Sequence, residues 1–140
     1  MKSRTKILLF ILASLVMAII FFKPSVVSAR NIANFSDFWV EGYNTHRTGY
    51  LGKTKYSRYV VQADAPTDRS KINLRTMILN SNGDWRSTEW GLTYEGTRNL
   101  HVNTASPGYI YAIEITRQYS YDGYATVSGS WSPDTRDGET

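Results

Sequence analysis

Few residues of this chain have the types and spacing that catalysis or metal binding requires. His46 and His101 are the only histidines among 140 residues, and neither has a neighbour at the spacing of a metal-ligand pair. No Gly-x-Ser-x-Gly motif is present, and Ser128 falls in an alternating segment, where a nucleophile would lack the strained, exposed turn of a hydrolase. We therefore interpret both histidines as surface or hydrogen-bonding residues, and we predict no catalytic residue, no bound metal and no cofactor.

Two acidic patterns leave weaker alternatives. Asn80, Asn82 and Asp84 alternate as in a calcium loop, but two of the three are neutral and the distal acidic ligand is missing, which favours a plain turn. Paired carboxylates can hydrolyse glycosidic bonds when folding brings them together. The carboxylates that could meet in this way are Asp64, Asp68, Glu89, Glu95 and Glu114. A cell-wall or polysaccharide hydrolase is accordingly the third hypothesis for the function.

Aromatic side chains are the feature with the most functional content. The chain has four tryptophans and ten tyrosines, all after residue 30. Buried rings would supply apolar contacts for a core without disulfides, whereas exposed rings would form a flat surface for a sugar, a peptide or another protein. The rings with polar neighbours and no place on an expected core face are Trp39, Tyr43, Trp85 and Trp90. We predict that these four form a binding surface.

The elements that must position these residues are short and β-like. Apolar and polar residues alternate with a period of two, as where Tyr109, Tyr111, Ile113 and Ile115 share one face. Turn signals separate the segments, and no sustained helical periodicity follows Phe22. The expected strands are residues 38–40, 56–62, 72–79, 85–94, 98–103, 109–117 and 124–131, with hairpins joining 72–79 to 85–94 and 98–103 to 109–117. Six or seven such strands predict an all-β fold, a small antiparallel β-sandwich.

The beginning of the chain has the pattern of a secretory signal peptide. Basic residues lead into an uncharged apolar run from 7 to 22, which Lys23 and Pro24 end. The run is shorter than the roughly 20 residues that a spanning helix needs, although an uncleaved anchor is the alternative. Small side chains precede the predicted cleavage site between Ala29 and Arg30. We expect a signal peptide at 1–29, one domain at 30–140 with a loose tail from about 135, and membrane contact only through the uncleaved leader.

Charge and cysteine content exclude several classes of partner. The chain has 16 basic and 12 acidic residues, and removal of the leader takes away four basic residues and no acidic one. The mature domain is therefore neutral, which argues against nucleic acid, an anionic membrane surface or a cationic antimicrobial peptide. No cysteine is present, so the domain must fold by burial and hydrogen bonding without disulfides.

The C-terminal segment carries a resemblance to a known family. Residues 129–134 read Gly-Ser-Trp-Ser-Pro-Asp after a tyrosine-rich strand. This segment resembles the ending of a family of small uncharacterised secreted proteins of Gram-positive bacilli, whose tail is Gly-x-Trp-Ser-Pro-Asp. The resemblance implies secretion and a compact β domain, and it supplies no activity. Trp131 also has a structural explanation, because it can close the core while Pro133 ends strand pairing.

Together these patterns predict an extracellular protein that acts without catalysis. The first hypothesis is a secreted binding or interaction module at or beyond the cell envelope, whose partner is a cell-wall glycan or an extracellular protein. The alternative is a bacteriocin-like toxin, since small exported β proteins can kill neighbouring cells by binding a wall precursor. Growth inhibition of related strains would distinguish the toxin from a passive binder.

Overall fold

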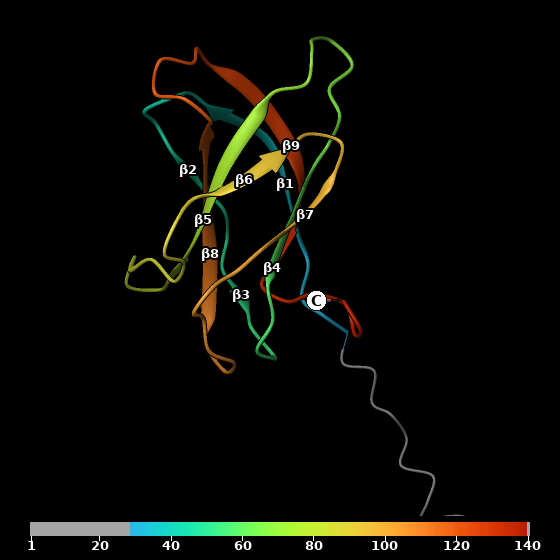
Figure 1. Cartoon of the computed structure of the whole chain (residues 1–140), viewed down its shortest axis with the longest axis vertical. Helices are drawn as coiled ribbons and strands as arrows, with labels where there is room; N and C mark the ends of the chain where they lie inside the picture. The colour runs from blue at the N-terminus through green and yellow to red at the C-terminus, as the bar shows by residue number, and fades with distance from the viewer. Residues whose placement is uncertain (1–28, 140) are drawn as a thin grey trace, which may run out of the picture.

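The computed structural model describes residues 29–139, so the predicted leader lies outside the described residues except for Ala29. This part contains nine strands and no helix. The strands are β1 (Ala33–Val40), β2 (His46–Arg47), β3 (Leu51–Gly52), β4 (Tyr59–Ala63), β5 (Asn73–Asn80), β6 (Gly91–Tyr94), β7 (Arg98–His101), β8 (Ile110–Arg117) and β9 (Ala125–Ser132). Figure 1 shows them in two layers. None of the described residues belongs to a helix that could cross a membrane.

Two antiparallel sheets form the layers. One has the strand order β1-β9-β4-β7, and the other has the order β2-β8-β5-β6, with β3 also paired to β8. The prediction of an all-β antiparallel sandwich is confirmed. The two shortest strands, β2 and β3, lie in a segment that the sequence predicts as a loop. They form because the outer side of β8 offers unpaired backbone groups to the chain that passes it.

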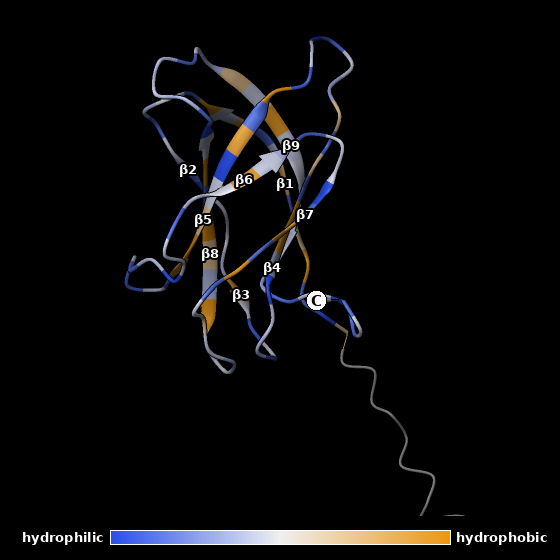
Figure 2. Cartoon of the chain, viewed as in Figure 1, coloured by the Kyte–Doolittle hydropathy of each residue, from blue (hydrophilic) through white to orange (hydrophobic). Residues whose placement is uncertain are grey.

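The core lies between the sheets and follows the alternation of the sequence. β8 contributes Tyr111, Ile113 and Ile115, and β9 contributes Val127 and Trp131, all of them buried. Apolar residues concentrate on the strands and polar residues on the connecting loops (Figure 2). Successive side chains of a strand point to opposite faces, so one set fills the space between the sheets. Each large apolar side chain that is fully buried stabilises the fold by about 1.5–3 kcal/mol.

The second half of β5 is buried on both faces, whereas alternation of polar and apolar residues along a strand is typical of one buried face. Leu74 and Ile78 face the core as expected, but Met77 and Leu79 are buried on the opposite side. The connection from β5 to β6 contacts that side, since the Ser87 hydroxyl lies 2.6 Å from Met77 Sδ and the Trp90 ring lies 5.4 Å from the Arg75 guanidinium. Packing of a loop over a sheet is a tertiary contact, and the periodicity of a single strand does not reveal it.

The strand pairing agrees with one expected hairpin and corrects the other. β5 pairs with β6, with Asn73 opposite Tyr94, although β6 begins only at Gly91. β7 and β8 do not pair with each other, because β7 pairs with β4 and β8 pairs with β5 in the other sheet. The Pro-Gly pair at 107–108 marks a turn in the chain, but a turn signal does not specify the partner of the next strand.

The antiparallel order sends the connecting loops to opposite ends of the sandwich. At one end, residues 41–45 contact residues 118–124, for example through the bond from Gly42 N to Asp122 O of 3.0 Å. At the other end, residues 53–58 contact residues 133–139. In Figure 1 the first end is at the top left, and the second lies beside the C-terminal label.

Residues 135–139, predicted to be loose, are in contact with the domain. Thr135 is buried, and the Glu139 carboxylate lies 2.6 Å from Arg98. Asp134, which precedes them, is fully buried against Lys53. This buried ion pair directs the following residues along the surface of the domain, where polar composition alone suggests a free tail.

Candidate functional site

The structure divides the four predicted surface aromatics into two groups. Trp39 is the last residue but one of β1 and Tyr43 lies in the next loop, whereas Trp85 and Trp90 lie in the connection from β5 to β6, which belongs to the other sheet. The Trp85 and Trp90 rings meet edge to face with centroids 6.1 Å apart, and the Arg75 guanidinium lies 5.4 Å from the Trp90 centroid. No ring contact among the described residues joins the two groups.

Trp39 and Tyr43 instead share one end of the sandwich with three tyrosines of the loop between β8 and β9. We call the five side chains the aromatic platform: Trp39, Tyr43, Tyr119, Tyr121 and Tyr124. All five are exposed, from 49% for Tyr119 to 82% for Tyr43. Trp39 and Tyr124 meet edge to face at 5.7 Å, and Tyr119 and Tyr121 stack at 5.3 Å with an interplanar angle of 2°. Two pairs of rings therefore stand in water at this end.

A glycine brings the two loops of the platform together. A Cβ atom on Gly42 would overlap the backbone carbonyl oxygens of Tyr119 and Ser120. Gly42 N donates to Asp122 O at 3.0 Å, so the loop after β1 lies directly on the loop after β8. Only glycine allows this approach of one backbone to another.

Hydrogen bonds within the second loop hold its tyrosines in place. Tyr119 N donates to the Asp122 carboxylate at 2.9 Å, and Asp122 N donates to Tyr119 O at 3.1 Å. The Arg117 guanidinium donates to Gly123 O at 2.8 Å. Thr116 Oγ1 donates to Glu41 O at 2.6 Å and ties the end of β8 to the first loop. The rings are thus carried by an ordered backbone, which lowers the entropy lost when a partner binds.

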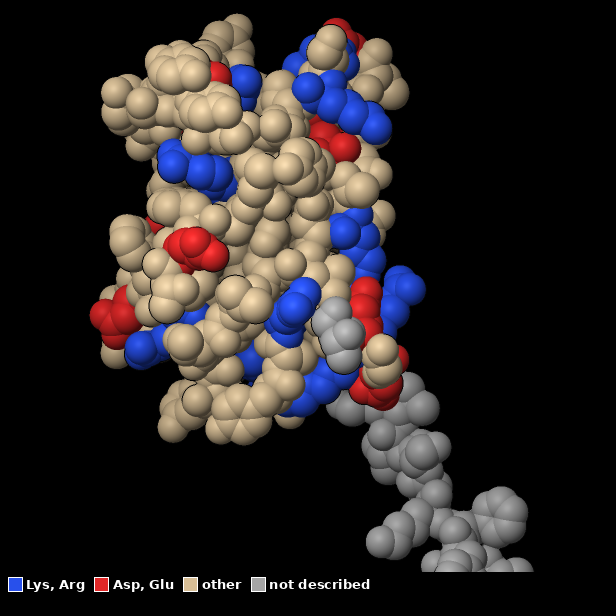
Figure 3. Space-filling model, in the orientation of Figure 1, with Lys and Arg blue, Asp and Glu red and all other residues tan. Residues whose placement is uncertain are grey.

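The platform presents hydroxyl and amide groups with few free charges. Arg117 and Asp122 lie 3.8 Å apart with mostly covered side chains, so they compensate each other beneath the rings. At the rim, the Gln118 amide donates to the Tyr119 hydroxyl at 3.1 Å. The upper-left part of Figure 3, over these loops, is mainly uncharged. Such a surface suits a partner with apolar faces and hydroxyl groups.

Sequence reasoning missed the three tyrosines of the second loop. A usable signal was present, since Tyr119, Tyr121 and Tyr124 fall within six residues around the turn residues Asp122 and Gly123. Rings in a polar turn have no regular core face to occupy, so their exposure follows from the local pattern. The contact of Tyr124 with Trp39 does not, because it depends on the pairing of β1 with β9.

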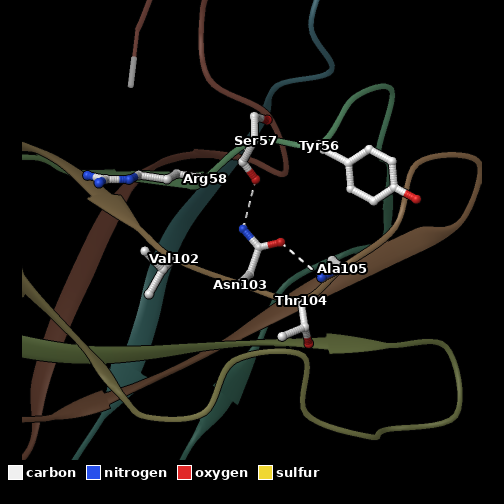
Figure 4. Close-up of a pocket in the computed structure, with 7 residues that line it drawn as sticks. All are labelled: Tyr56, Ser57, Arg58, Val102, Asn103, Thr104 and Ala105. Atoms are coloured by element: carbon white, nitrogen blue, oxygen red, sulfur yellow. Dashed lines mark hydrogen bonds between the residues drawn. The ribbon is translucent and has the colours of Figure 1, made fainter.

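A shallow hollow at the other end is a weaker candidate site. Residues 56–58 and 102–105 line a cavity of about 350 Å³ (Figure 4). Asn103 in its wall donates to Ser57 O at 2.9 Å and accepts from Ala105 N at 3.1 Å. Both functional groups of this amide are therefore engaged in holding the two segments together, which leaves few free polar groups to orient a ligand.

The two histidines have structural roles in this geometry. His101 is partly buried on β7, its Nε2 lies 2.9 Å from Thr93 Oγ1, and burial lowers the pKa of its imidazole to about 4. The ring fills the space above Gly91, where a Cβ atom would overlap it. His46 lies on β2 with its ring 4.2 Å from the ring of Phe38. Thr93, the partner of the His101 imidazole, is fully buried, so this pair lies in the interior of the fold.

Two of the carboxylates proposed for hydrolysis are held by arginines of the domain. Glu95 is buried and accepts from both Arg69 and the Ile72 backbone N–H, and Glu114 on β8 accepts from Arg47 at 2.7 Å. Residues 80–84 form a turn in which Asp84 N donates to Asn80 Oδ1 at 2.8 Å. Within residues 29–139, no three histidine or acidic side chains are grouped so that they could hold a metal ion.

Comparisons with known proteins add little to this description. No family model matches the chain, and no curated protein matches it. A solved structure, the crystal structure of Yersinia pseudotuberculosis-derived mitogen (YPM), is 12% identical in sequence and has a TM-score of 0.45. The match covers 79% of this chain and 92% of that chain.

Proposed function

We propose that the protein is an exported, non-enzymatic binding module that holds a saccharide chain of the cell envelope against the aromatic platform. The observation that carries the proposal is that five exposed aromatic side chains lie near the end of β1 and on the two loops that a close glycine contact joins. The aromatics come from segments about 80 residues apart in the chain, as for Trp39 and Tyr119.

The exposure of these rings argues for a partner. An aromatic side chain can bury roughly 150–250 Å² of surface, and each Å² of apolar surface removed from water contributes about 25 cal/mol. Single exposed apolar residues are common on proteins, but a contiguous group of large ones marks an interaction site. The sandwich has a full core without these five side chains. Their contribution to stability is therefore small, and their contribution to binding is expected to be large.

The chemistry of the surface favours a saccharide as the partner. One face of a pyranose ring presents C–H groups that pack on an aromatic ring, while its hydroxyl groups need donors and acceptors at the edge. Tyrosine hydroxyls and the Gln118 amide supply such groups next to the rings. The neighbouring charges of Arg117 and Asp122 compensate each other, which suits an uncharged partner. A protein partner is the competing outcome of the test below.

Export rests on the sequence of the leader. Its basic start, uncharged apolar run and small residues before Arg30 support transport out of the cytoplasm and cleavage after Ala29. The absence of cysteine from the whole chain is compatible with either compartment. Mass spectrometry of the protein from the culture medium of the expressing host would test this part, with an N-terminus at Arg30 as the expected result.

Two exposed tryptophans provide a matched pair of variants for the binding test. Trp39 is 61% exposed and contacts Tyr124 edge to face, whereas Trp85 is 58% exposed and contacts Trp90 edge to face outside the platform. We expect Trp39→Ala to weaken binding on a glycan array or to purified wall polysaccharide about tenfold or more, which corresponds to at least about 1.4 kcal/mol. Trp85→Ala should bind like the unchanged protein.

Three results would count against the proposal. Equal losses in both variants would show that the platform is not the site. Binding to an envelope protein but to no saccharide would show that the partner is a protein. Release of new reducing ends from the polysaccharide, abolished by changing one acidic residue, would show that the protein is an enzyme.

A further inference from the structure

A cluster of basic residues lies at the end of the sandwich opposite the platform. We call it the basic corner, and its cationic side chains are Arg30, Lys55, Arg58, Arg98 and Arg136. Two carboxylates accompany them, Asp137 and Glu139. The corner therefore has three more positive than negative groups, although the chain without its leader has equal numbers of both. Folding therefore brings cations together in one corner of a domain whose total charge is neutral.

Two adjoining hollows give the corner its shape. One of about 190 Å³ is lined by residues that include Arg30, Lys55 and Arg136. The other, of about 340 Å³, is lined by residues that include Arg58, Lys55 and Arg136. Lys55 and Arg136 border both hollows, so four of the five cations line one continuous surface. Arg98 adjoins it through its bonds to Glu139. In Figure 3 blue side chains gather with a few red ones at the lower right of the molecule.

Several cations of the corner lack a negative partner. Lys55 lies 2.7 Å from Asp137, and Arg98 donates twice to Glu139, at 2.7 and 2.6 Å. Arg58 and Arg136 are exposed, and neither forms an ion pair within the part of the chain that the structure describes. These guanidinium groups are free to donate hydrogen bonds to a bound anion.

Arg30 adds a second and independent observation. Its Nη1 atom is buried and has no hydrogen-bond partner among the described residues. Burial and then the nearby charges of Arg98 and Arg136 lower the pKa of its guanidinium. A buried N–H group without an acceptor is unfavourable, and a guanidinium remains charged in proteins. An anion bound here would accept a hydrogen bond from Nη1 and would also balance the positive charge.

We propose that the basic corner is an anion-binding site that takes the phosphate groups of a polymer. Four of its five cations are arginines, whose planar forks match the oxygen atoms of phosphate better than a lysine ammonium does. A tetrahedral phosphate has enough acceptor oxygens to reach guanidinium groups on different sides of a hollow. Two hollows side by side suit successive phosphates of one chain. Cleavage at the predicted bond after Ala29 would place an α-ammonium group in the same corner.

The test uses the protein as isolated from expressing cells and a short linear polyphosphate as the probe. We expect saturable binding by calorimetry that weakens as the salt concentration rises, because bound phosphates release counterions. Arg58→Glu and Arg136→Glu should each weaken the affinity about tenfold, the effect of losing one charge-assisted contact. Both side chains are exposed, so thermal unfolding should remain unchanged in the two variants.

Lys71→Glu is the control variant. Lys71 is exposed, lies outside both hollows, and its replacement changes the net charge by the same amount. An equal loss of affinity in this variant would overturn the proposal, since it would show a response to net charge alone. The absence of saturable polyphosphate binding would overturn it as well. Equally tight binding of polyglutamate would refute the choice of phosphate, and equally tight binding of orthophosphate would refute the polymer.

Discussion

The two ends of the sandwich differ in which side chains they expose to water and which they bury. At one end, the five rings of the aromatic platform, near the end of β1 and on two loops, are exposed to water. At the other, Lys53 and Asp134 are drawn completely out of water, with both side chains 0% exposed and an Nζ to Oδ1 distance of 3.2 Å. The first end exposes aromatic rings, which proteins usually bury, and the second end buries an ion pair, which proteins usually leave in water.

The hydrogen bonds show what the buried pair does. Asp134 accepts from the backbone N–H and the hydroxyl of Thr54 at 2.7 and 2.9 Å, and from the Ser57 hydroxyl at 3.0 Å. Lys53 donates to the carbonyl oxygens of Ser57 and Pro133. Burial opposes the charge on Asp134, but the bonds from Thr54 and the charge of Lys53 outweigh it, so the pKa of this carboxyl lies below its usual value. The charged groups of this pair are bonded within the domain, which indicates a structural role.

Burial distinguishes the structural ion pair, which water does not reach, from the candidate binding surface, whose rings are exposed. The platform rings have few contacts to lose with the core, whereas the Lys53–Asp134 pair joins the loop 53–58 to the end of the chain. Changes at the two ends should therefore affect different measurements: stability at the buried pair, and binding at the platform.

The largest expected effect is on stability, from Asp134→Asn. The variant leaves the Lys53 ammonium buried without a counter-charge, and breaking a buried pair in this way costs about 3–5 kcal/mol. Urea unfolding followed by tryptophan fluorescence measures the loss. Binding of the folded fraction to polysaccharide should be unchanged, and a loss of binding as large as that of Trp39→Ala would break the distinction between the ends.

A double variant sharpens this prediction. Lys53→Met with Asp134→Leu replaces both charges by apolar groups of similar length, and such replacements of buried pairs are often neutral. We expect the double variant to be clearly more stable than Asp134→Asn. If both variants lose the same free energy, the hydrogen bonds of Asp134 contribute more than the charges do.

The second effect depends on pH and concerns His101, which lies in the strands between the two ends. Its pKa is about 4 in the fold against an ordinary value of 6.5, so the unfolded chain binds more protons between these two values. Stability should therefore fall by up to about 3 kcal/mol as the pH drops from 7 to 4. Urea midpoints at several pH values measure the slope. His101→Gln removes the titrating group, and an unchanged slope in this variant would contradict the assignment.

The smallest effect on stability is expected at the platform, from Gly42→Ala. The added methyl group would overlap the carbonyl oxygens of Tyr119 and Ser120 and push the two loops apart, at a cost of about 1–3 kcal/mol. Because the loops carry the rings, polysaccharide binding should also fall. Gly123→Ala in the same loop is the control, since a Cβ atom there has no neighbour within 4 Å. Equal effects of both changes would argue against the close contact as the basis of the platform.

The local pattern predicted much of the fold and less of the site. The alternation in residues 109–117 predicts that Tyr111, Ile113 and Ile115 lie on the core face, because successive side chains of a strand point to opposite faces of the sheet. It could not show that the connection to β6 contacts Met77, or that 98–103 pairs with β4. Among the rings chosen from the sequence, Trp39 and Tyr43 share one end of the molecule, and Trp85 and Trp90 lie elsewhere.

The sequence by itself determined the class of the fold, the inward faces of its main strands and the places where its turns occur, since each depends on residues that are close in the chain. Tertiary structure alone decided which loops meet. The contacts of Gly42 with Ser120, and of Lys53 with Asp134, join residues about 80 positions apart, and they arise from strand pairing across the sheets. Both the exposed platform and the buried ion pair follow from that pairing, because it sets which side chains water can reach.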